Sequence, residues 1–472
     1  MNLISGKRPN VLLIYTDQQR IDSLSAYGDC PIKTRNIDML ASEGVKFEKC
    51  FVQNPVCGPS RMSFLTGRYC SGIGVGTNGM EFPRDTCIPV NRILRDYGYE
   101  TAQIGKLHFQ PHAKRDARDI YPNYGFDRFI VSDEPGCYDD AYTKWVEMNK
   151  PDELPGVRTS LPPAACRYHK PEYAAMPRNT HEPYVFSADS AFSHSAFVAS
   201  ETCRFLRERQ PNKPFFAIAG FYAPHPPVNP PRQYIDQVDV NKIKLPVKSQ
   251  IPEVMPELQD ITDDEWRKII QYYLALVLHV DDCIGEILNT LKEMNAWDNT
   301  LIIFTADHGE YLGDYGKIQK GMPGYDCITN VPMIFHFPKK IRPGRTVKCL
   351  IEAIDIVPTI LDYCGVQSPP FIQGTSLFEL LEGKTNHHKH EVLIENFVPY
   401  GLKETTVRTE QFMYYCNSAG QELLFDLQED PRELHNVASR ASYQNQLSDM
   451  RKRMIMKIQT AAYPNRETLA EY

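Results

Sequence analysis

The sequence predicts an α/β protein: a large domain with a mainly parallel central sheet sandwiched by helices, followed by a smaller C-terminal α+β subdomain. Three observations support this prediction. Continuous apolar runs, typical of strands buried on both faces, alternate with segments of helical period. At 472 residues the chain exceeds the size at which one hydrophobic core stops growing. Beyond Gly383 the pattern changes to short strand-like runs and one charged helical segment.

Five apolar runs are the predicted strands of the large domain, and polar residues directly follow four of them. The carboxyl ends of parallel strands form the ligand-binding edge of an open α/β sheet, so we expect these polar residues to line one crevice. The strands are expected at Arg8–Thr16, Thr101–Gly105, Phe215–Tyr222, Asn299–Ala306 and Val331–Phe337. The helices are expected at Asn36–Glu43, Val90–Tyr97, Asp189–Arg209, Asp263–Met294 and Asp355–Cys364.

We place the large domain at residues 1–385 and the subdomain at residues 386–472. Within the large domain, Gln110–Tyr184 is rich in Pro, Tyr, His and Arg, and its weak periodicity predicts an irregular insertion over the strand ends. Its basic residues could bind a ligand, but residues of this kind usually lie on the solvent-exposed surface without one. They include Arg115, Arg118, Arg167, His169 and Arg178.

The subdomain begins with a His-rich stretch, which we interpret as a solvated linker rather than a metal site. This stretch contains His387, His388 and His390. Strand-like runs follow at Glu391–Glu395, Thr405–Cys416 and Glu422–Asp426, and a charged helix is expected from about Ala438.

Composition and charge argue against several classes of protein. A net charge of -7 makes the chain a poor general binder of nucleic acid, and no apolar run approaches the length of a membrane span. The run Val11–Tyr15 is too short for the core of a signal peptide. Thirteen cysteines without regular spacing indicate reduced thiols and a cytoplasmic protein, whereas a signal peptide removed from the chain would indicate the periplasm.

The stretch from Cys57 to Arg68, CGPSRMSFLTGR, is the part of the sequence richest in chemical information. Pro59 suits a first helical turn and Gly67 can end the helix. The start of this helix would bind anions beside Cys57, and Arg61 adds a cation one turn further on. A lone cysteine is usually a small buried hydrophobe, but the pattern around this one is long and specific.

The stretch resembles the type I sulfatase signature, C-x-P-S-R followed by L-T-G-R. In that family a maturation enzyme converts the cysteine to formylglycine, whose hydrated aldehyde is the nucleophile, and the fold is alkaline phosphatase-like. The resemblance extends from Arg8 to about Pro338, and Leu424–Pro431 is similar to a C-terminal phrase of sulfatases.

The resemblance implies a divalent metal held by Asp17, Gln18, Asp307, His308 and residue 57. Ligands that are mostly oxygen atoms favour Ca²⁺ or Mg²⁺, and an imidazole ligand is also compatible with Mn²⁺. Many sulfatases have Asp where this chain has Gln18 and Asn where it has His308. Both departures are shared with phosphonate monoester hydrolases.

The resemblance also implies the remaining catalytic residues. Lys106 would contact the sulfate, and His108, in the phrase Gly-Lys-x-His, would be the base that regenerates the aldehyde. His225 is the candidate general acid on the leaving-group side. Lys320 would face the same side, and Lys317, which is close to it in sequence, is an alternative for this role. Asn78 is either a turn residue or a substrate contact.

We therefore expect a sulfatase that hydrolyses a sulfate monoester on a carbohydrate or aryl alcohol. The alternatives are a phosphonate monoester or phosphodiester hydrolase using the same nucleophile, and a protein that binds sulfated glycans without cleaving them. Lys106 and His108 favour the sulfatase, because the phosphonate hydrolases lack that pair. A two-zinc phosphatase fits less well, since no second set of Asp and His ligands follows the predicted strands.

Overall fold

The computed structural model describes residues 8–111, 121–137, 139–158, 182–248 and 254–462. The basic residues named above in the predicted insertion, Arg115, Arg118, Arg167, His169 and Arg178, lie outside these ranges. Within the described ranges, no helix combines the length and the apolar composition needed to cross a bilayer.

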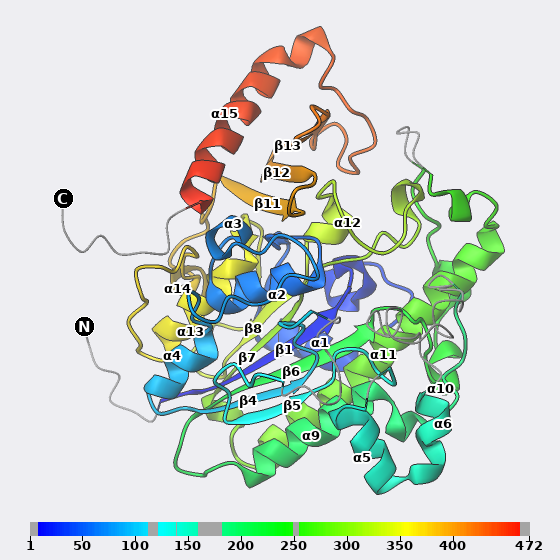
Figure 1. Ribbon diagram of the computed structural model, residues 1–472, viewed down its shortest axis with the longest axis vertical. Helices are drawn as coiled ribbons and strands as arrows, with labels where there is room; N and C mark the ends of the chain where they lie inside the picture. The colour runs from blue at the N-terminus through cyan, green and yellow to red at the C-terminus, as the bar shows by residue number, and fades with distance from the viewer. Residues whose placement is uncertain (1–7, 112–120, 138, 159–181, 249–253, 463–472) are drawn as a thin grey trace.

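An eight-stranded sheet runs through the centre of the molecule, in the order β5-β4-β6-β1-β7-β8-β2-β9 (Figure 1). All neighbouring strands pair in parallel except at β8, which runs antiparallel to β7 and β2. The strands are β1 (Asn10–Asp17), β2 (Val45–Phe47), β4 (Glu100–Gly105), β5 (Arg128–Val131), β6 (Phe215–Pro224), β7 (Thr300–Ala306), β8 (Met333–His336) and β9 (Arg345–Val347). The predicted mainly parallel sheet is confirmed.

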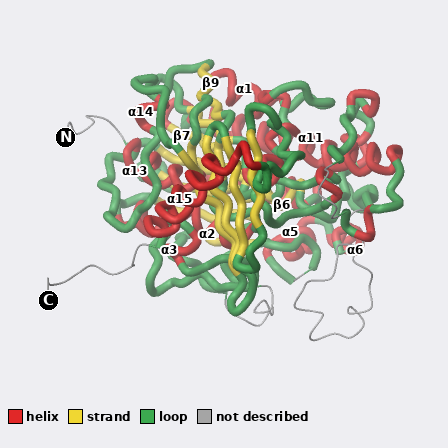
Figure 2. The backbone as a smooth tube through the Cα atoms, turned by 90° about the horizontal axis from the view of Figure 1, so that it is seen from above, coloured by secondary structure: helices red, strands yellow, loops and turns green. Residues whose placement is uncertain are grey.

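Helices cover both faces of this sheet, as Figures 1 and 2 show. Alternate residues of β1 divide between two cores, because successive side chains of a strand point to opposite faces. Val11 and Leu13 pack with α2, α4 and α13, whereas Leu12 and Ile14 pack with α1, α9 and α11. These helices are α1 (Arg35–Glu43), α2 (Cys57–Thr66), α4 (Val90–Asp96), α9 (His194–Glu208), α11 (Asp263–Glu293) and α13 (Ile356–Tyr363).

Shorter elements complete the large domain. The strands β3 (Cys50–Phe51) and β10 (Ile351–Glu352) form a separate parallel pair. The short helices are α3 (Cys70–Ile73), α10 (Arg232–Ile235), α12 (Asp326–Thr329) and α14 (Phe378–Leu381).

The segment predicted as an irregular insertion, residues 110–184, contains regular structure. Its strand β5 forms the edge of the central sheet, and its helices are α5 (Ala141–Asn149) and α6 (Leu154–Val157). The prediction of an irregular segment was wrong for these residues. An edge strand of four half-buried residues gives too short a pattern to be recognised in sequence.

The C-terminal region forms a four-stranded antiparallel sheet with one long helix. The strands β11 (Glu391–Phe397), β12 (Lys403–Thr409), β13 (Phe412–Asn417) and β14 (Glu422–Asp426) pair in chain order, and α15 (Gln444–Ala461) packs against them. The single run expected at Thr405–Cys416 is two strands, because the Thr409 hydroxyl accepts the N–H groups of Gln411 and Phe412 and closes a turn. The helix begins at Gln444 rather than near Ala438.

The His-rich stretch is not a solvated linker throughout. The ammonium of Lys389 is buried between the carboxylates of Glu352 and Asp355. The Nε2 atom of His388 lies 3.1 Å from Asp355 Oδ2. Burial alone would raise the pKa of Asp355, but Lys389 and His388 hold it at about 2. The stretch therefore anchors the start of the C-terminal sheet to the large domain.

Replacing Lys389 with Met is expected to lower the free energy of unfolding by about 3–5 kcal/mol at pH 7, because two buried carboxylates lose their cation. An unfolded Asp titrates near pH 4, so the stabilisation from Asp355 is present above about pH 4 and is lost as the pH falls toward 2. The deficit of the variant should therefore shrink over that interval. Urea unfolding at several pH values measures both effects.

The matched control is Lys384→Met, which removes an exposed lysine paired with Glu382. This change should cost less than about 1 kcal/mol at any pH, since exposed ion pairs contribute little. Equal losses for the two variants would contradict a buried ion cluster at Lys389.

Candidate active site

Four neighbouring parallel strands bring the predicted site residues to one edge of the sheet. The order β4-β6-β1-β7 places the carboxyl ends of these strands side by side. Lys106, His225, Asp17 and Asp307 lie at or directly after those ends. At the end of β4, a Cβ on Gly105 would come within 2.2 Å of the carbonyl oxygen of Gly220 in β6, so glycine permits this close packing of the strands.

Helix α2 delivers Cys57 to this edge as its first residue. All ten residues of the helix are buried, and Gly67 ends it with φ of 68°, a left-handed conformation that suits glycine. The N–H of Gly58 in the first turn donates to Asn78 Oδ1 at 2.9 Å. Asn78 therefore contacts the helix start beside Cys57, and its predicted contact with substrate stays a prediction.

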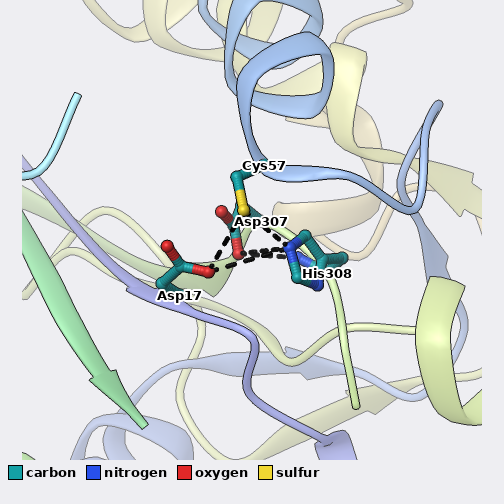
Figure 3. Close-up of side chains that lie close together, drawn as sticks. All are labelled: Asp17, Cys57, Asp307 and His308. Atoms are coloured by element: carbon teal, nitrogen blue, oxygen red, sulfur yellow. Dashed lines mark hydrogen bonds and ion pairs between the residues drawn. The ribbon is translucent and has the colours of Figure 1, made fainter. Parts of the chain in front are cut away.

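Asp17, Cys57, Asp307 and His308 converge, with one possible ligand atom from each lying within 4.8 Å of the others (Figure 3). The Sγ atom of Cys57 lies 3.2 Å from His308 Nε2 and 3.6 Å from Asp17 Oδ1. The Nδ1 atom of His308 lies 2.8 Å from the carbonyl oxygen of Gly309, which leaves Nε2 to face the group. These four residues were all predicted to be metal ligands.

Arg61 holds the two carboxylates of this group together. Its Nη2 atom lies 2.8 Å from Asp17 Oδ2 and 2.7 Å from Asp307 Oδ2, and its Nε donates to the same oxygen of Asp307 at 2.8 Å. All three side chains are fully buried. The other oxygen of Asp307 accepts the N–H groups of Gln18 and His308.

Two lysines bring further positive charge to the group. Lys106 forms an ion pair with Asp17 and lies 4.4 Å from the ring centroid of Tyr222. Lys320 Nζ donates to Cys57 Sγ at 2.6 Å and lies 3.0 Å from His225 Nε2. The sequence left Lys317 as an alternative to Lys320 for the role on the leaving-group side, and the structure places Lys320 in contact with Cys57.

These cations decide the pKa values of the acidic groups. Burial alone would raise the pKa of Asp17, yet Lys106 and Arg61 hold it well below its usual value. Burial and Asp17 would likewise raise the pKa of the Cys57 thiol, but Lys320 and Lys106 lower it. The position of Sγ is therefore one where negative charge is stabilised.

Gln18 completes the set of possible ligands through its amide oxygen. Its Nε2 group donates to the buried carboxylate of Glu310, while Oε1 is buried without a hydrogen-bond partner among the described residues. Glu310 thus fixes the amide so that the oxygen is left for another group. An orphaned buried oxygen on the residue that follows Asp17, together with the carboxylates and imidazole of the group, is a donor set that fits a divalent cation.

His225 is held as a neutral imidazole. Its Nδ1 atom lies 2.6 Å from the carbonyl oxygen of Pro226, so Nδ1 carries the proton and Nε2 accepts from Lys320. Burial, Lys320 and Lys106 lower the pKa of His225 well below its usual value. Lys320 therefore holds the proton that the two side chains share.

Sequence reasoning missed two supporting carboxylates. Asp133 accepts the N–H groups of Leu107 and His108 at 2.6 and 2.9 Å, which fixes the loop after β4 and the buried His108. Glu310 orients Gln18 as described above. Both signals were present in principle: Asp133 follows strand β5, and Glu310 directly follows Asp307-His308-Gly309.

Two curated relatives match nearly the whole chain. It is 28% identical over 473 residues to an arylsulfatase of Clostridium perfringens, with 96% of this chain and 95% of that protein covered. It is 27% identical over 495 residues to an N-acetylglucosamine-6-O-sulfatase of Bacteroides thetaiotaomicron, with 93% and 84% covered.

The phosphonate monoester hydrolase of Agrobacterium radiobacter has a similar structure, with a TM-score of 0.79, 26% identity and 96% of each chain covered. This likeness confirms the predicted alkaline phosphatase-like fold. The family profile described as N-sulphoglucosamine sulphohydrolase, C-terminal, matches residues 313–460, and the profile described as sulfatase matches residues 9–366. The sulfatase match spans more than half of the chain, so this protein belongs to the sulfatase family of sulfuric ester hydrolases.

Proposed function

We propose that this protein hydrolyses a sulfate monoester on a carbohydrate or aryl alcohol, with residue 57 as the nucleophile. The observation that carries the proposal is the position of Cys57 Sγ, in contact with Lys320 and His308 and close to Asp17. Its chemical environment stabilises an anion there and holds cations ready for a sulfate group. The names of the arylsulfatase and glucosamine sulfatase relatives support the same substrate class.

Conversion of Cys57 to formylglycine by a maturation enzyme would place the hydrated aldehyde, which is the family's nucleophile, at the position that Sγ holds here. The side chains around residue 57 then have distinct tasks. Lys106 and Lys320 bind the sulfate oxygens, and Arg61 holds the two carboxylates in place through its ion pairs. His108 acts as the base that takes the proton from residue 57 when the sulfate is released.

A divalent cation fits the ligand set, and we assign it to Asp17, Gln18, Asp307, His308 and residue 57. Ca²⁺ and Mg²⁺ suit the carboxylate and amide oxygens, and the imidazole also admits Mn²⁺. Such an ion supplies Lewis-acid stabilisation of negative charge at the sulfate. Glu310 is a positioning residue for this site, because it acts only through the amide of Gln18.

Replacing Glu310 with Gln should weaken binding of Ca²⁺ or Mn²⁺ by about 10- to 100-fold, the usual cost of losing an outer hydrogen-bond partner. The new amide keeps the size of the side chain but no longer reliably accepts from Gln18 Nε2, so the ligand oxygen is no longer fixed. Isothermal titration calorimetry with each metal measures the change without reference to turnover.

Glu410→Gln, at an exposed glutamate in the turn between β12 and β13, is the control and should leave metal affinity unchanged. If Glu310→Gln binds both metals as tightly as the unaltered protein, the assignment of Gln18 as an oriented ligand is wrong.

The proton for the departing alcohol comes from Lys320 and His225 acting together. In the resting site Lys320 carries the proton and His225 Nε2 accepts from it. As negative charge develops on the alcohol oxygen, His225 Nε2 takes the proton from Lys320 Nζ and delivers it from the same nitrogen to that oxygen, which leaves Lys320 neutral, while Nδ1 keeps its proton on the Pro226 carbonyl. This refines the expectation that His225 alone is the general acid.

His225→Gln is expected to lower kcat/KM for an alkyl sulfate by about 10²- to 10⁴-fold, the usual range for a general acid. The loss should be much smaller for 4-nitrophenyl sulfate, because nitrophenolate leaves without needing a proton. Steady-state kinetics with both esters checks the difference. An equal loss for the two esters would mean that His225 has only a structural role.

The phosphonate monoester or phosphodiester hydrolase remains the second candidate. Two observations favour it: the similarity to the Agrobacterium radiobacter enzyme, and the pairs Asp17-Gln18 and Asp307-His308. Lys106 and His108 favour the sulfatase, as the resemblance implies. A third candidate, a protein that binds sulfated glycans without cleaving them, is opposed by the complete set of charged groups around Cys57.

A panel of an aryl sulfate, a sulfated sugar and a phenylphosphonate ester separates the three candidates. We expect the highest kcat/KM for a sulfate ester, and Cys57→Ala should reduce turnover to the uncatalysed background because the nucleophile is lost. High turnover of the phosphonate ester alone would favour the second candidate. Binding of the sulfated sugar without turnover, in protein confirmed by mass spectrometry to carry formylglycine, would favour the third.

A further inference from the structure

An open pocket of about 440 Å³ adjoins the proposed active site on the side of Lys320. Its walls come from residues 254–256 and from residues 311–322, the segment that carries Lys320. Because the ammonium of Lys320 reaches both Cys57 and His225, the pocket begins where the leaving alcohol of a bound ester would lie. It is therefore placed to receive the part of the substrate beyond the sulfate.

The lining of this pocket is mostly apolar, with one further cation. Its apolar residues are Val254, Met255, Pro256, Tyr311, Ile318 and Met322. Such a surface suits the apolar face of a sugar or aryl ring. The remaining lining residue, Lys317, lies three positions before Lys320, and its Nζ is 6.0 Å from the ring centroid of Tyr311.

Lys317 has no counterion in the part of the chain that the structure describes. No described carboxylate lies within 4.0 Å of its Nζ, whereas Lys106 is paired with Asp17 and Lys320 contacts Cys57. Lys317 is half-buried, and a bound anion would supply the counterion that its ammonium lacks among the described residues. The pocket thus combines an apolar surface with an ammonium that has no carboxylate partner among the described residues.

We propose that this pocket is a subsite for a second anionic group on the substrate alcohol, held by Lys317. The proposal rests on the sulfate ester hydrolysis inferred above and narrows its substrate class to alcohols that carry a further sulfate or a carboxylate. The apolar lining supports the ring, Lys320 faces the scissile ester, and Lys317 binds the second anion. Singly charged esters use the first two contacts only.

The test measures binding to the Cys57→Ala protein, so that it does not depend on turnover. Dissociation constants for N-acetylglucosamine 6-sulfate and glucosamine N,6-disulfate are measured by calorimetry, and an aryl sulfate with and without a ring carboxylate forms the second pair. The doubly charged member of at least one pair should bind about tenfold more tightly, as expected for one charge-assisted contact. A preference within the sugar pair identifies the second anion as a sulfate, and a preference within the aryl pair identifies it as a carboxylate.

Lys317→Met should reduce that preference to about one, whereas Lys317→Arg, which keeps the charge, should retain most of it. Lys340→Met removes an exposed lysine that has no ion pair among the described residues and should retain the full preference. Raising the ionic strength should weaken the preference in the unaltered protein, since the contact is partly exposed. The preference, rather than either affinity alone, is the quantity compared.

Two results would overturn the subsite: no preference for the doubly charged member of either pair, or a preference that survives Lys317→Met. Failure of the proposed function looks different. If the unaltered protein turns over no sulfate ester, while the binding preference persists and depends on Lys317, the subsite stands and the assigned reaction is wrong.

Discussion

The proposed active site depends on one buried guanidinium. Arg61 reaches from helix α2 to two carboxylates at the ends of β1 and β7, and all three groups are shielded from solvent. Leaving any of them without its partner in the interior would cost several kcal/mol, so the helix and the two strands must assemble together. Cys57 lies one turn earlier on the same helix. The interaction that holds the fold together here also fixes the position of the nucleophile.

The C-terminal sheet takes part in building this site, although it lies beyond the predicted boundary near residue 385. Residues 311–328, which include the segment carrying Lys320, share one hydrophobic core with β11, β13 and β14. Arg408 of β12 is paired with Asp326 and Glu433, and Glu433 accepts the N–H of Asp326 at 2.9 Å. The division into two domains stays a prediction, but the contacts make the subdomain a support for Lys320.

Much of the fold and the site could be predicted from the sequence, because the informative residues directly follow buried apolar runs. Parallel strands bring their carboxyl ends together, so the local pattern predicted that Asp17 and Asp307 lie at one edge of the sheet, and the resemblance to sulfatases supplied their expected role. The residues that support the site could not be predicted in this way. Glu310 and Asp133 act through the amide of Gln18 and the N–H groups of residues 107 and 108, and these contacts exist only once the chain is folded. For the same reason, pattern alone assigned Lys389 and its neighbours to solvent.

Among the described residues, Arg61, Lys106 and Lys320 bring positive charge to Asp17, Asp307 and Cys57 in a chain of net charge -7, so the positive charge around Cys57 is local. The two lysines are not stabilised equally. Burial lowers the pKa of Lys106 more than Asp17 raises it, whereas contact with Cys57 and Asp17 raises the pKa of Lys320 in spite of burial. A bound anion beside Lys106 would therefore stabilise the less favourable of the two lysine charges. The positive charge available to an anionic substrate in the proposed site is therefore supplied by side chains around Cys57 rather than by the overall charge of the chain.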